Sequence, residues 1–363
     1  MRILFATTHT YLPQRVGGSE ASTHDLAKEM LAQGHEPAVL CGLSTGDSTW
    51  LRNRVIKGIS RKHFPADTFR PYRVFRGYEV GAAAIHEVAA SFKPDAAVVQ
   101  AGHPVPLARA LVAAGIPTLL YFRDVVFDRL GGEIQSHPLL RFVANSRFTA
   151  AEVERSFNVK AEVIPPLVHS TAYATTRRPR YALFINPVAS KGLETVLELA
   201  KRNPDIPFLL LESWPLGDEA RRSLTRQSAT LANVELRRPT LDMKNVYHGA
   251  RLLLVPSRSP EAWGRVATEA QFSGIPVLAS KIGGLPESVG HGGLLVPPSA
   301  GIDAWHQALR RIWDNPEQEQ ALSRAATEYA ARAEIRPERL IADLLSVLGQ
   351  IQPLPPPPST PKV

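Results

Sequence analysis

The sequence predicts an α/β protein of two doubly wound domains, each a parallel sheet with helices on both faces, that face each other across a cleft. Two observations predict this fold class. Short apolar runs alternate with helical patterns as far as Pro298, and the same order of strand, loop, helix and strand begins at Arg2 and again at Tyr181. A length of 363 residues fits two domains of ordinary size.

The first domain is expected over residues 1–167. It opens with an apolar strand (2–7), a Gly-containing loop, a helical pattern (19–33) that stops at Gly34, and a second strand (37–41). That order is a Rossmann-like βαβ unit. Later runs predict a helix at 105–114 and strands at 95–100, 117–121 and 142–144. The alternation implies a parallel sheet covered on both faces.

A linker is expected at 168–180, where Pro, small polar and basic residues follow one another without periodicity. The second domain, 181–330, repeats the pattern with a helix at 193–202 and strands at 181–185, 207–212, 234–236, 252–255, 276–279 and 293–296. A helical segment, 331–352, is expected to pack back on the first domain. The composition of the Pro-rich tail, 353–363, predicts disorder.

The composition limits the class of partner and the compartment. A formal charge of +8 favours anionic partners, such as nucleotide diphosphates, lipid phosphates, anionic glycans or nucleic acid. The single cysteine, Cys41, excludes an internal disulfide framework and predicts a reduced, buried thiol. The N-terminus lacks a signal-peptide pattern, and no run approaches the roughly 20 apolar residues that span a bilayer. We therefore expect a cytoplasmic protein, with peripheral contact at the inner face of a membrane.

The segment from Pro256 to Pro297 carries most of the candidate chemistry. Glu261 lies in a loop after a buried strand, and Glu269 lies on a helix that Gly264 opens. Open α/β sheets bind ligands beyond the carboxyl ends of their strands, so both carboxylates are expected at one cleft. Carboxylates accept bidentate hydrogen bonds from the vicinal hydroxyls of ribose or hexose. A second loop, Gly283-Gly284, offers backbone amides for close approach to a sugar or a phosphate.

The order "PEAWG…TEA", "GIPV", "GGLPE" and "GGLLVPP" resembles the retaining glycosyltransferases of family 4, which have the GT-B fold. The E-x7-E pattern of that family matches Glu261 and Glu269. The resemblance covers nearly the whole chain. It extends to "VGGSEASTHDLAKEM" after the first strand, to "FVANSRFTAAEV" and "VIPPLV", and to "FINPVASKG" at the start of the second domain.

The resemblance implies a retaining, metal-independent transfer of a sugar from a UDP- or GDP-sugar co-substrate to the hydroxyl of a glycan or lipid-linked acceptor. It implies no cofactor and no metal, and the chain carries no D-x-D motif. Lys191 and the Gly17-Gly18 turn would face the diphosphate of the donor. Glu269 would hold the ribose. Glu261 would position the donor sugar together with the backbone at Trp263, Gly264 and Arg265.

Two departures from the family pattern concern the cleft. The family has an arginine five residues before the loop lysine, where this chain has Asn186, so Arg258 or Arg265 would have to replace it. The family often has a histidine that contacts the transferred sugar where this chain reads "LLYFRD", which offers Arg123 and Asp124 instead. His103, in "QAGHP", either supplies that ring or caps the turn at the following proline.

The acceptor side is predicted in the first domain, where the stretch 51–80 has eight basic residues against two acidic ones. Arg73 and Arg76 belong to it. The stretch predicts either an anionic acceptor or lipid surface, or a solvated basic loop and hairpin. Nucleic acid is not expected, because no aromatic residues are grouped for stacking.

Three other functions remain alternatives at this point. A dehydrogenase is disfavoured because no strand is followed by G-x-G-x-x-G with an acidic residue about twenty positions on. A GT-B sugar-nucleotide epimerase would use the same donor without an acceptor, whereas a GT-B phosphorylase would need pyridoxal phosphate and a longer chain. A non-catalytic, sugar-nucleotide-binding partner subunit is the third alternative, which the substitutions at Asn186 and Arg123 favour.

Overall fold

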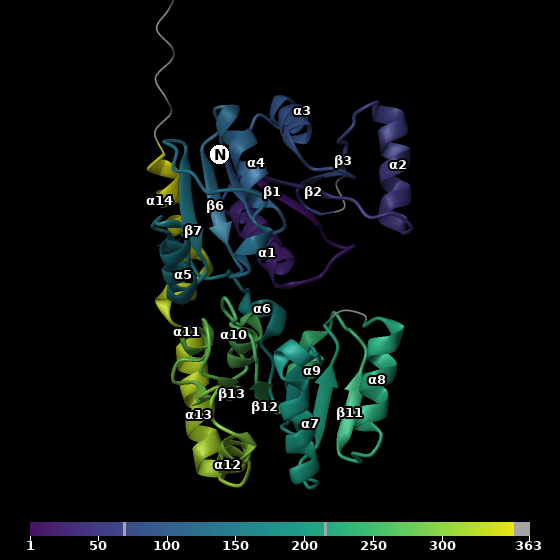
Figure 1. Ribbon diagram of the computed structural model, residues 1–363, viewed down its shortest axis with the longest axis vertical. Helices are drawn as coiled ribbons and strands as arrows, with labels where there is room; N and C mark the ends of the chain where they lie inside the picture. Colours follow the sequence, from purple (N-terminus) through teal and green to yellow (C-terminus); the bar gives the residue numbers. More distant parts are fainter. Residues whose placement is uncertain (68–69, 214–215, 352–363) are drawn as a thin grey trace, which may run out of the picture.

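The chain folds into two lobes, each built on its own parallel sheet, as the computed structural model shows (Figure 1). The structure describes residues 1–67, 70–213 and 216–351. The Pro-rich tail predicted to be disordered, 353–363, lies outside the described residues.

The first lobe contains an eight-stranded sheet, in the order β3-β4-β2-β1-β5-β6-β7-β8 within the described residues. Only β3 and β4 run antiparallel to each other. The strands are β1 (Arg2–Thr10), β2 (Glu36–Gly42), β3 (Ala66–Asp67), β4 (Arg73–Gly77), β5 (Ala96–Val99), β6 (Thr118–Phe122), β7 (Leu140–Ala144) and β8 (Glu162–Val163). The helices are α1 (Gly18–Ala32), α2 (Ser48–Ser60), α3 (Ala82–Phe92), α4 (Pro104–Ala113), η1 (Phe127–Arg129) and α5 (Arg147–Phe157).

The short helix α6 (Ser170–Tyr173) leads into the second lobe. Its described strands form a six-stranded parallel sheet in the order β11-β10-β9-β12-β13-β14. The strands are β9 (Tyr181–Ile185), β10 (Phe208–Leu211), β11 (Val234–Arg237), β12 (Ala250–Val255), β13 (Val277–Ser280) and β14 (Gly293–Val296). The helices are η2 (Ala189–Lys191), α7 (Leu193–Arg202), α8 (Asp218–Ser228), α9 (Met243–Gly249), α10 (Arg265–Gln271), α11 (Leu285–Val289), α12 (Ile302–Trp313), α13 (Pro316–Ala330) and η3 (Ala333–Ile335).

The last helix, α14 (Pro337–Gly349), returns to the first lobe, where Figure 1 shows it in yellow along the side that carries α5. Its apolar residues Leu340 and Leu344 share a buried core with Leu26 and Met30 of α1. Burial of a leucine side chain contributes about 2 kcal/mol, so this face fastens the C-terminal segment to the first sheet. No helix in the described ranges combines the length and the apolar character needed to span a membrane.

The central strands are apolar on both faces because both faces are covered. In β1, Ile3 and Phe5 point into the core shared with α1 and α14, while Leu4 and Ala6 point into the core beneath α3 and α4. A parallel strand buried on both sides is therefore a continuous apolar run, not an alternating one.

The strand order creates one switch point in each sheet. The chain moves outward from β1 to β2 and then returns to β5 on the other side of β1. In the second sheet it moves outward from β9 and returns to β12. Loops that follow strands at such a point leave a crevice between them, which is where open α/β sheets bind ligands.

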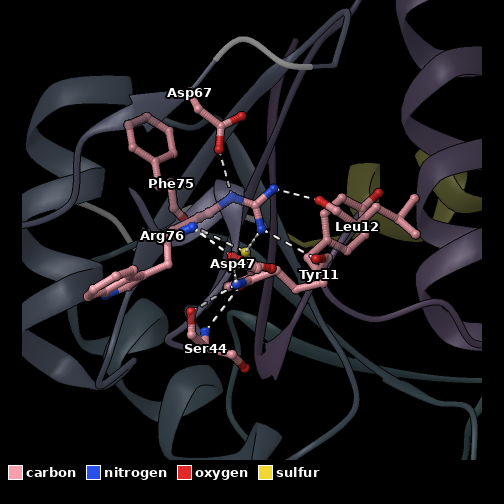
Figure 2. Close-up of polar contacts among 10 residues, drawn as sticks. Tyr11, Leu12, Ser44, Asp47, Asp67, Phe75 and Arg76 are labelled. Atoms are coloured by element: carbon pink, nitrogen blue, oxygen red, sulfur yellow. Dashed lines mark hydrogen bonds and ion pairs between the residues drawn. The ribbon is translucent and has the colours of Figure 1, made fainter. Parts of the chain in front are cut away.

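The acceptor-side prediction for Arg76 is wrong, because this arginine is fully buried in the first lobe (Figure 2). Its Nε lies 2.6 Å from an oxygen of Asp67, and its Nη2 donates to the carbonyl of Leu12 at 2.6 Å. The side chain thus joins the loop after β1 to the β3–β4 hairpin. Arg73 begins β4, at the edge opposite the carboxyl ends, and pairs with Glu36 at 3.5 Å. Neither arginine is placed to bind an acceptor.

Replacement of Arg76 tests its structural role. Arg76→Met should lower the free energy of unfolding by about 3 kcal/mol, because it leaves the Asp67 carboxylate buried without its guanidinium. Denaturant unfolding monitored by circular dichroism measures the loss. Arg73→Met, which removes a half-exposed pair on the same strand, should cost under about 1 kcal/mol. Equal losses in the two variants would contradict this role of Arg76.

Candidate functional site

A cavity of about 900 Å³ lies between the two lobes. On the first lobe it is lined by residues at the end of β1 and by residues that follow β5 and β6, including His9, Gly102 and Arg123. On the second lobe it is lined by residues that follow β9 and β12, including Asn186 and Ser257. The cavity therefore joins the two switch points of the sheets.

Lys191 and Glu261 meet in this cavity. Lys191 ends η2 after β9, and Glu261 lies in the loop after β12, which is the neighbour of β9. The Lys191 Nζ atom is 2.5 Å from a carboxylate oxygen of Glu261, and the hydroxyl of Ser257 donates to the same oxygen at 2.6 Å. The Lys191 side chain is 35% exposed, so its ammonium group reaches both the protein carboxylate and the open cavity.

Gly283 and Gly284 hold the Glu261 loop in place, and they do not line the cavity. Gly283 has a φ of +60°, and a Cβ atom there would collide with the backbone of Glu261. The Gly284 amide donates to the Glu261 carbonyl at 2.7 Å. The expectation that these glycines offer their amides to a sugar or a phosphate is therefore corrected. Glycine is required there because the backbone of the Glu261 loop packs against these two residues.

Glu269 lies at the buried end of the cavity. Its two oxygens accept hydrogen bonds from Arg265 Nε at 2.8 Å and from the Tyr247 hydroxyl at 2.9 Å. Burial raises the pKa of Glu269, and the adjacent guanidinium opposes that shift. Trp263 also lines the cavity, with its indole N–H turned away to the Thr268 hydroxyl at 3.0 Å.

Arg265 connects the lobes. From the first turn of α10 its guanidinium reaches Asp25 of α1 at 2.6 Å, the Ser22 hydroxyl at 2.7 Å and the carbonyl of Leu167 at 2.8 Å. Burial alone would lower the pKa of Arg265, but the carboxylates of Glu269 and Asp25 outweigh burial and raise it. A guanidinium with this many protein partners is not available to replace the missing arginine of the diphosphate site.

The first wall of the cavity is the start of α1. Gly17 and Gly18 line it, and the helix begins at Gly18. Glu20 is buried there, 3.2 Å from Arg15 and 3.9 Å from a ring nitrogen of His9. Burial would raise the pKa of Glu20, yet the bond to His9, the helix backbone and Arg15 together lower it. The helix N-terminus thus already faces one carboxylate of the protein.

The remaining predicted residues are divided between the cavity and the outer surface. Arg123, Asp124 and His103 line the cavity from the first lobe. His103 is exposed, and its ring makes no capping bond to α4. Arg258 does not line the cavity; it pairs with Glu194 on the exposed face of the second lobe. It is therefore not placed to replace the missing arginine either.

Two family models match this chain. A glycosyltransferase family 4 model matches residues 16–171, and a glycosyl transferases group 1 model matches residues 173–329. The chain is a member of glycosyltransferase family 4. The junction between the two models falls at residue 172, within the segment 168–180 that the sequence predicts as the linker.

Curated relatives of this family 4 chain match part of it. A D-inositol 3-phosphate glycosyltransferase from Saccharomonospora viridis is 46% identical over 93 residues, which are 25% of this chain and 21% of that protein. Another, from an Arthrobacter species, is 29% identical over 218 residues, which are 52% of this chain and 51% of that protein. These matches span between about a fifth and about half of the relatives' own length.

Solved structures share the fold over nearly the full length. A glycosyltransferase from Rickettsia africae superposes with a TM-score of 0.75 at 16% identity, covering 96% of this chain and 98% of its own. Anabaena Alr3699/HepE, in complex with UDP and glucose, gives a TM-score of 0.74 at 18% identity, covering 96% and 99%. The fold is GT-B, as the sequence predicts.

Sequence reasoning missed several side chains of this family 4 cavity, among them His9 and Asn145. His9 lies near the carboxyl end of β1 on the cavity side, and its position at the end of the first apolar run was a signal that could have identified it. Glu287 of the "GGLPE" turn was also missed. Its carboxylate accepts the amides of Arg147 and Phe148 at 2.8 Å each, so the second lobe caps helix α5 of the first. Nothing local to Glu287 indicates this partner.

Several charged groups of the cavity are held in ion pairs. Lys191 pairs with Glu261, Arg265 pairs with Glu269 and Asp25, and Arg15 pairs with Glu20. In the described ranges, no group of three or more His, Cys, Asp or Glu side chains is arranged to hold a metal ion.

Proposed function

We propose that this family 4 protein is a retaining glycosyltransferase that transfers a hexose from a nucleotide-diphosphate sugar to an acceptor hydroxyl. The observation that carries the proposal is the convergence of Lys191, Glu261 and Glu269 at a cavity that joins both switch points. A cation beside two carboxylates suits a ligand with an anionic diphosphate between two hydroxyl-bearing rings. The complex of Anabaena Alr3699/HepE with UDP and glucose supports a ligand of this class.

In the proposed reaction the bond between the anomeric carbon and the diphosphate oxygen breaks. A bond to the acceptor oxygen forms on the same face of the sugar, and the acceptor proton leaves with the nucleoside diphosphate. Lys191 and the amides at Gly17-Gly18 stabilise the charge that grows on the leaving diphosphate, so no metal ion is needed. Glu261 orients the transferred sugar, and Glu269 accepts hydrogen bonds from the ribose hydroxyls.

The acceptor is proposed to be a glycan or lipid-linked hydroxyl that enters from the first lobe. His103 and Asp124 line that wall and are exposed, so both are reachable by an incoming hydroxyl. The name of the curated relatives adds inositol phosphates to the acceptors worth testing.

The test is nucleoside diphosphate release from a panel of UDP-, GDP- and ADP-sugars, with and without EDTA, followed by NMR of the product anomer. We expect release that EDTA does not reduce and a product that keeps the anomeric configuration of the donor. Tight donor binding without turnover would favour the partner-subunit alternative. Release of an isomerised donor would favour the epimerase.

Two substitutions test the proposed roles in the same assay. Lys191→Ala should lower kcat about 100-fold, the size typical of losing one preorganised charge contact in the transition state. Glu269→Ala should sharply weaken donor use, because it removes the ribose acceptor. Arg258→Ala is the matched control and should leave kcat/KM within about twofold. Unchanged donor binding in Glu269→Ala would count against the assignment of that residue.

We further propose that α2 gives this enzyme peripheral contact with an anionic membrane. The helix stands at the outer edge of the first lobe (Figure 1). Leu51, Val55 and Ile59, spaced four residues apart on one helix face, are 58%, 56% and 81% exposed. The residues around them are basic and exposed, namely Arg52, Arg54, Lys57, Arg61 and Lys62. An apolar stripe with basic flanks suits a helix lying in the interface of anionic lipid.

Vesicle flotation tests this contact. The wild-type protein should float with vesicles that contain phosphatidylglycerol and not with pure phosphatidylcholine, because each basic residue near an anionic surface adds about 1 kcal/mol. The double variant V55E/I59E should lose at least tenfold in vesicle affinity. Leu31→Glu, at an exposed apolar position of α1, is the matched control. Equal flotation of the double variant and the wild type would contradict the proposal.

A further inference from the structure

Arg123, at the wall of the cavity, has guanidinium nitrogens that lack hydrogen-bond partners among the described residues. It follows β6 directly and lines the cavity from the first lobe. Its Nε and Nη2 atoms are buried and have no hydrogen-bond partner among the described residues. The guanidinium lies over the ring of Tyr121, with 4.2 Å between Cζ and the ring centroid.

This arrangement is costly unless an anion completes it. Buried N–H groups of a cation that lack a hydrogen-bond partner are unfavourable, and stacking on one aromatic ring offsets only part of that cost. Nε and Nη2 form one side of the guanidinium fork, the side that binds two oxygens of a phosphate or carboxylate in parallel. The two atoms without partners are therefore the pair that recognises such a group.

The carboxylate that acts most on the Arg123 guanidinium is already paired. Glu20 is one of its electrostatic neighbours, and that carboxylate is held by Arg15 and His9. Arg265 is another neighbour, and its positive charge together with burial lowers the pKa of Arg123. The anion that would complete the site must come from a ligand.

The position of Arg123 indicates which ligand group this is. Arg123 lines the same cavity as Gly17 and Gly18 at the start of α1, the turn proposed to face the diphosphate. Across the same cavity, Asn186 occupies the place of the family's diphosphate arginine. Its buried side-chain oxygen also has no hydrogen-bond partner.

We propose that Arg123 supplies the second positive charge on the donor diphosphate, in place of the arginine that other family 4 members carry at the position of Asn186. The inference rests on the proposed function, because it requires a nucleotide-diphosphate donor. Lys191 then holds the diphosphate from the second lobe while Arg123 holds it from the first. Stabilisation of the leaving group therefore depends on both lobes at once.

Isothermal titration with nucleotides tests the proposal without turnover. The wild type is titrated first with UDP, GDP and ADP and with the corresponding monophosphates UMP, GMP and AMP. The diphosphate and monophosphate of the base that binds most tightly are then used for all variants. The wild type should prefer the diphosphate over the monophosphate. In Arg123→Gln that preference should fall at least tenfold while monophosphate affinity stays within twofold. Arg123→Lys keeps the positive charge but lacks the guanidinium fork, so its preference for the diphosphate should lie between those of the wild type and Arg123→Gln. Arg109→Gln, at an exposed arginine of α4 outside the cavity, should match the wild type.

Three outcomes overturn the inference, and they are distinguishable. An unchanged diphosphate preference in Arg123→Gln, with a raised KM for the sugar donor or acceptor, would assign Arg123 to an anionic group on the sugar or acceptor. Equal weakening of both nucleotides, with a lowered melting temperature, would make the residue structural. Lack of any nucleotide binding by the wild type would instead refute the proposed function itself.

Discussion

The cleft depends on the contacts of one guanidinium, that of Arg265. It joins α10 of the second lobe to Asp25 and Ser22 of α1 and to the backbone carbonyl of Leu167 beside the linker. Two buried carboxylates, Asp25 and Glu269, are neutralised by this group, so its removal would leave both without their guanidinium partner. Because α1 and α10 both begin at the cavity, this contact also sets the distance between its two walls.

The charges of the cavity follow from that constraint. Arg265 neutralises Glu269 and Asp25, Lys191 neutralises Glu261, and Arg15 neutralises Glu20, whereas the Nε and Nη2 atoms of the partly buried Arg123 have no hydrogen-bond partner among the described residues. A site with such a guanidinium on one wall and an accessible lysine on the other is suited to a diphosphate. The net positive charge of the chain becomes selective for a diphosphate only through Arg123 and Lys191, which face the cavity from opposite walls.

Much of the fold could be predicted from the sequence because its signals are local. The strand Tyr181–Ile185 and the helix Leu193–Arg202 match the predicted bounds, since apolar runs and helical periodicity mark them directly. The position of Glu261 and Lys191 at the cavity also follows from the sequence, because residues after buried parallel strands gather at one edge of the sheet.

The errors concern contacts between distant segments. The burial of Arg76 depends on Asp67 and on carbonyls of the loop after β1, and nothing near Arg76 in the sequence indicates it. Gly283 matches a sugar-binding loop by composition, but its neighbour is the backbone of Glu261, some twenty residues earlier in the chain. Arg258 and Arg265 flank the same loop in the sequence. Arg258 pairs with Glu194 of its own lobe, whereas Arg265, at the start of α10, pairs with Asp25 of the other lobe.

A crystal structure with the preferred nucleoside diphosphate would test the central claim most directly. The account predicts that the diphosphate lies between the lobes, with its oxygens within hydrogen-bond distance of Lys191 Nζ and of Arg123 Nε and Nη2. A nucleotide whose phosphates lie away from Lys191, or outside the cavity between the lobes, would contradict it.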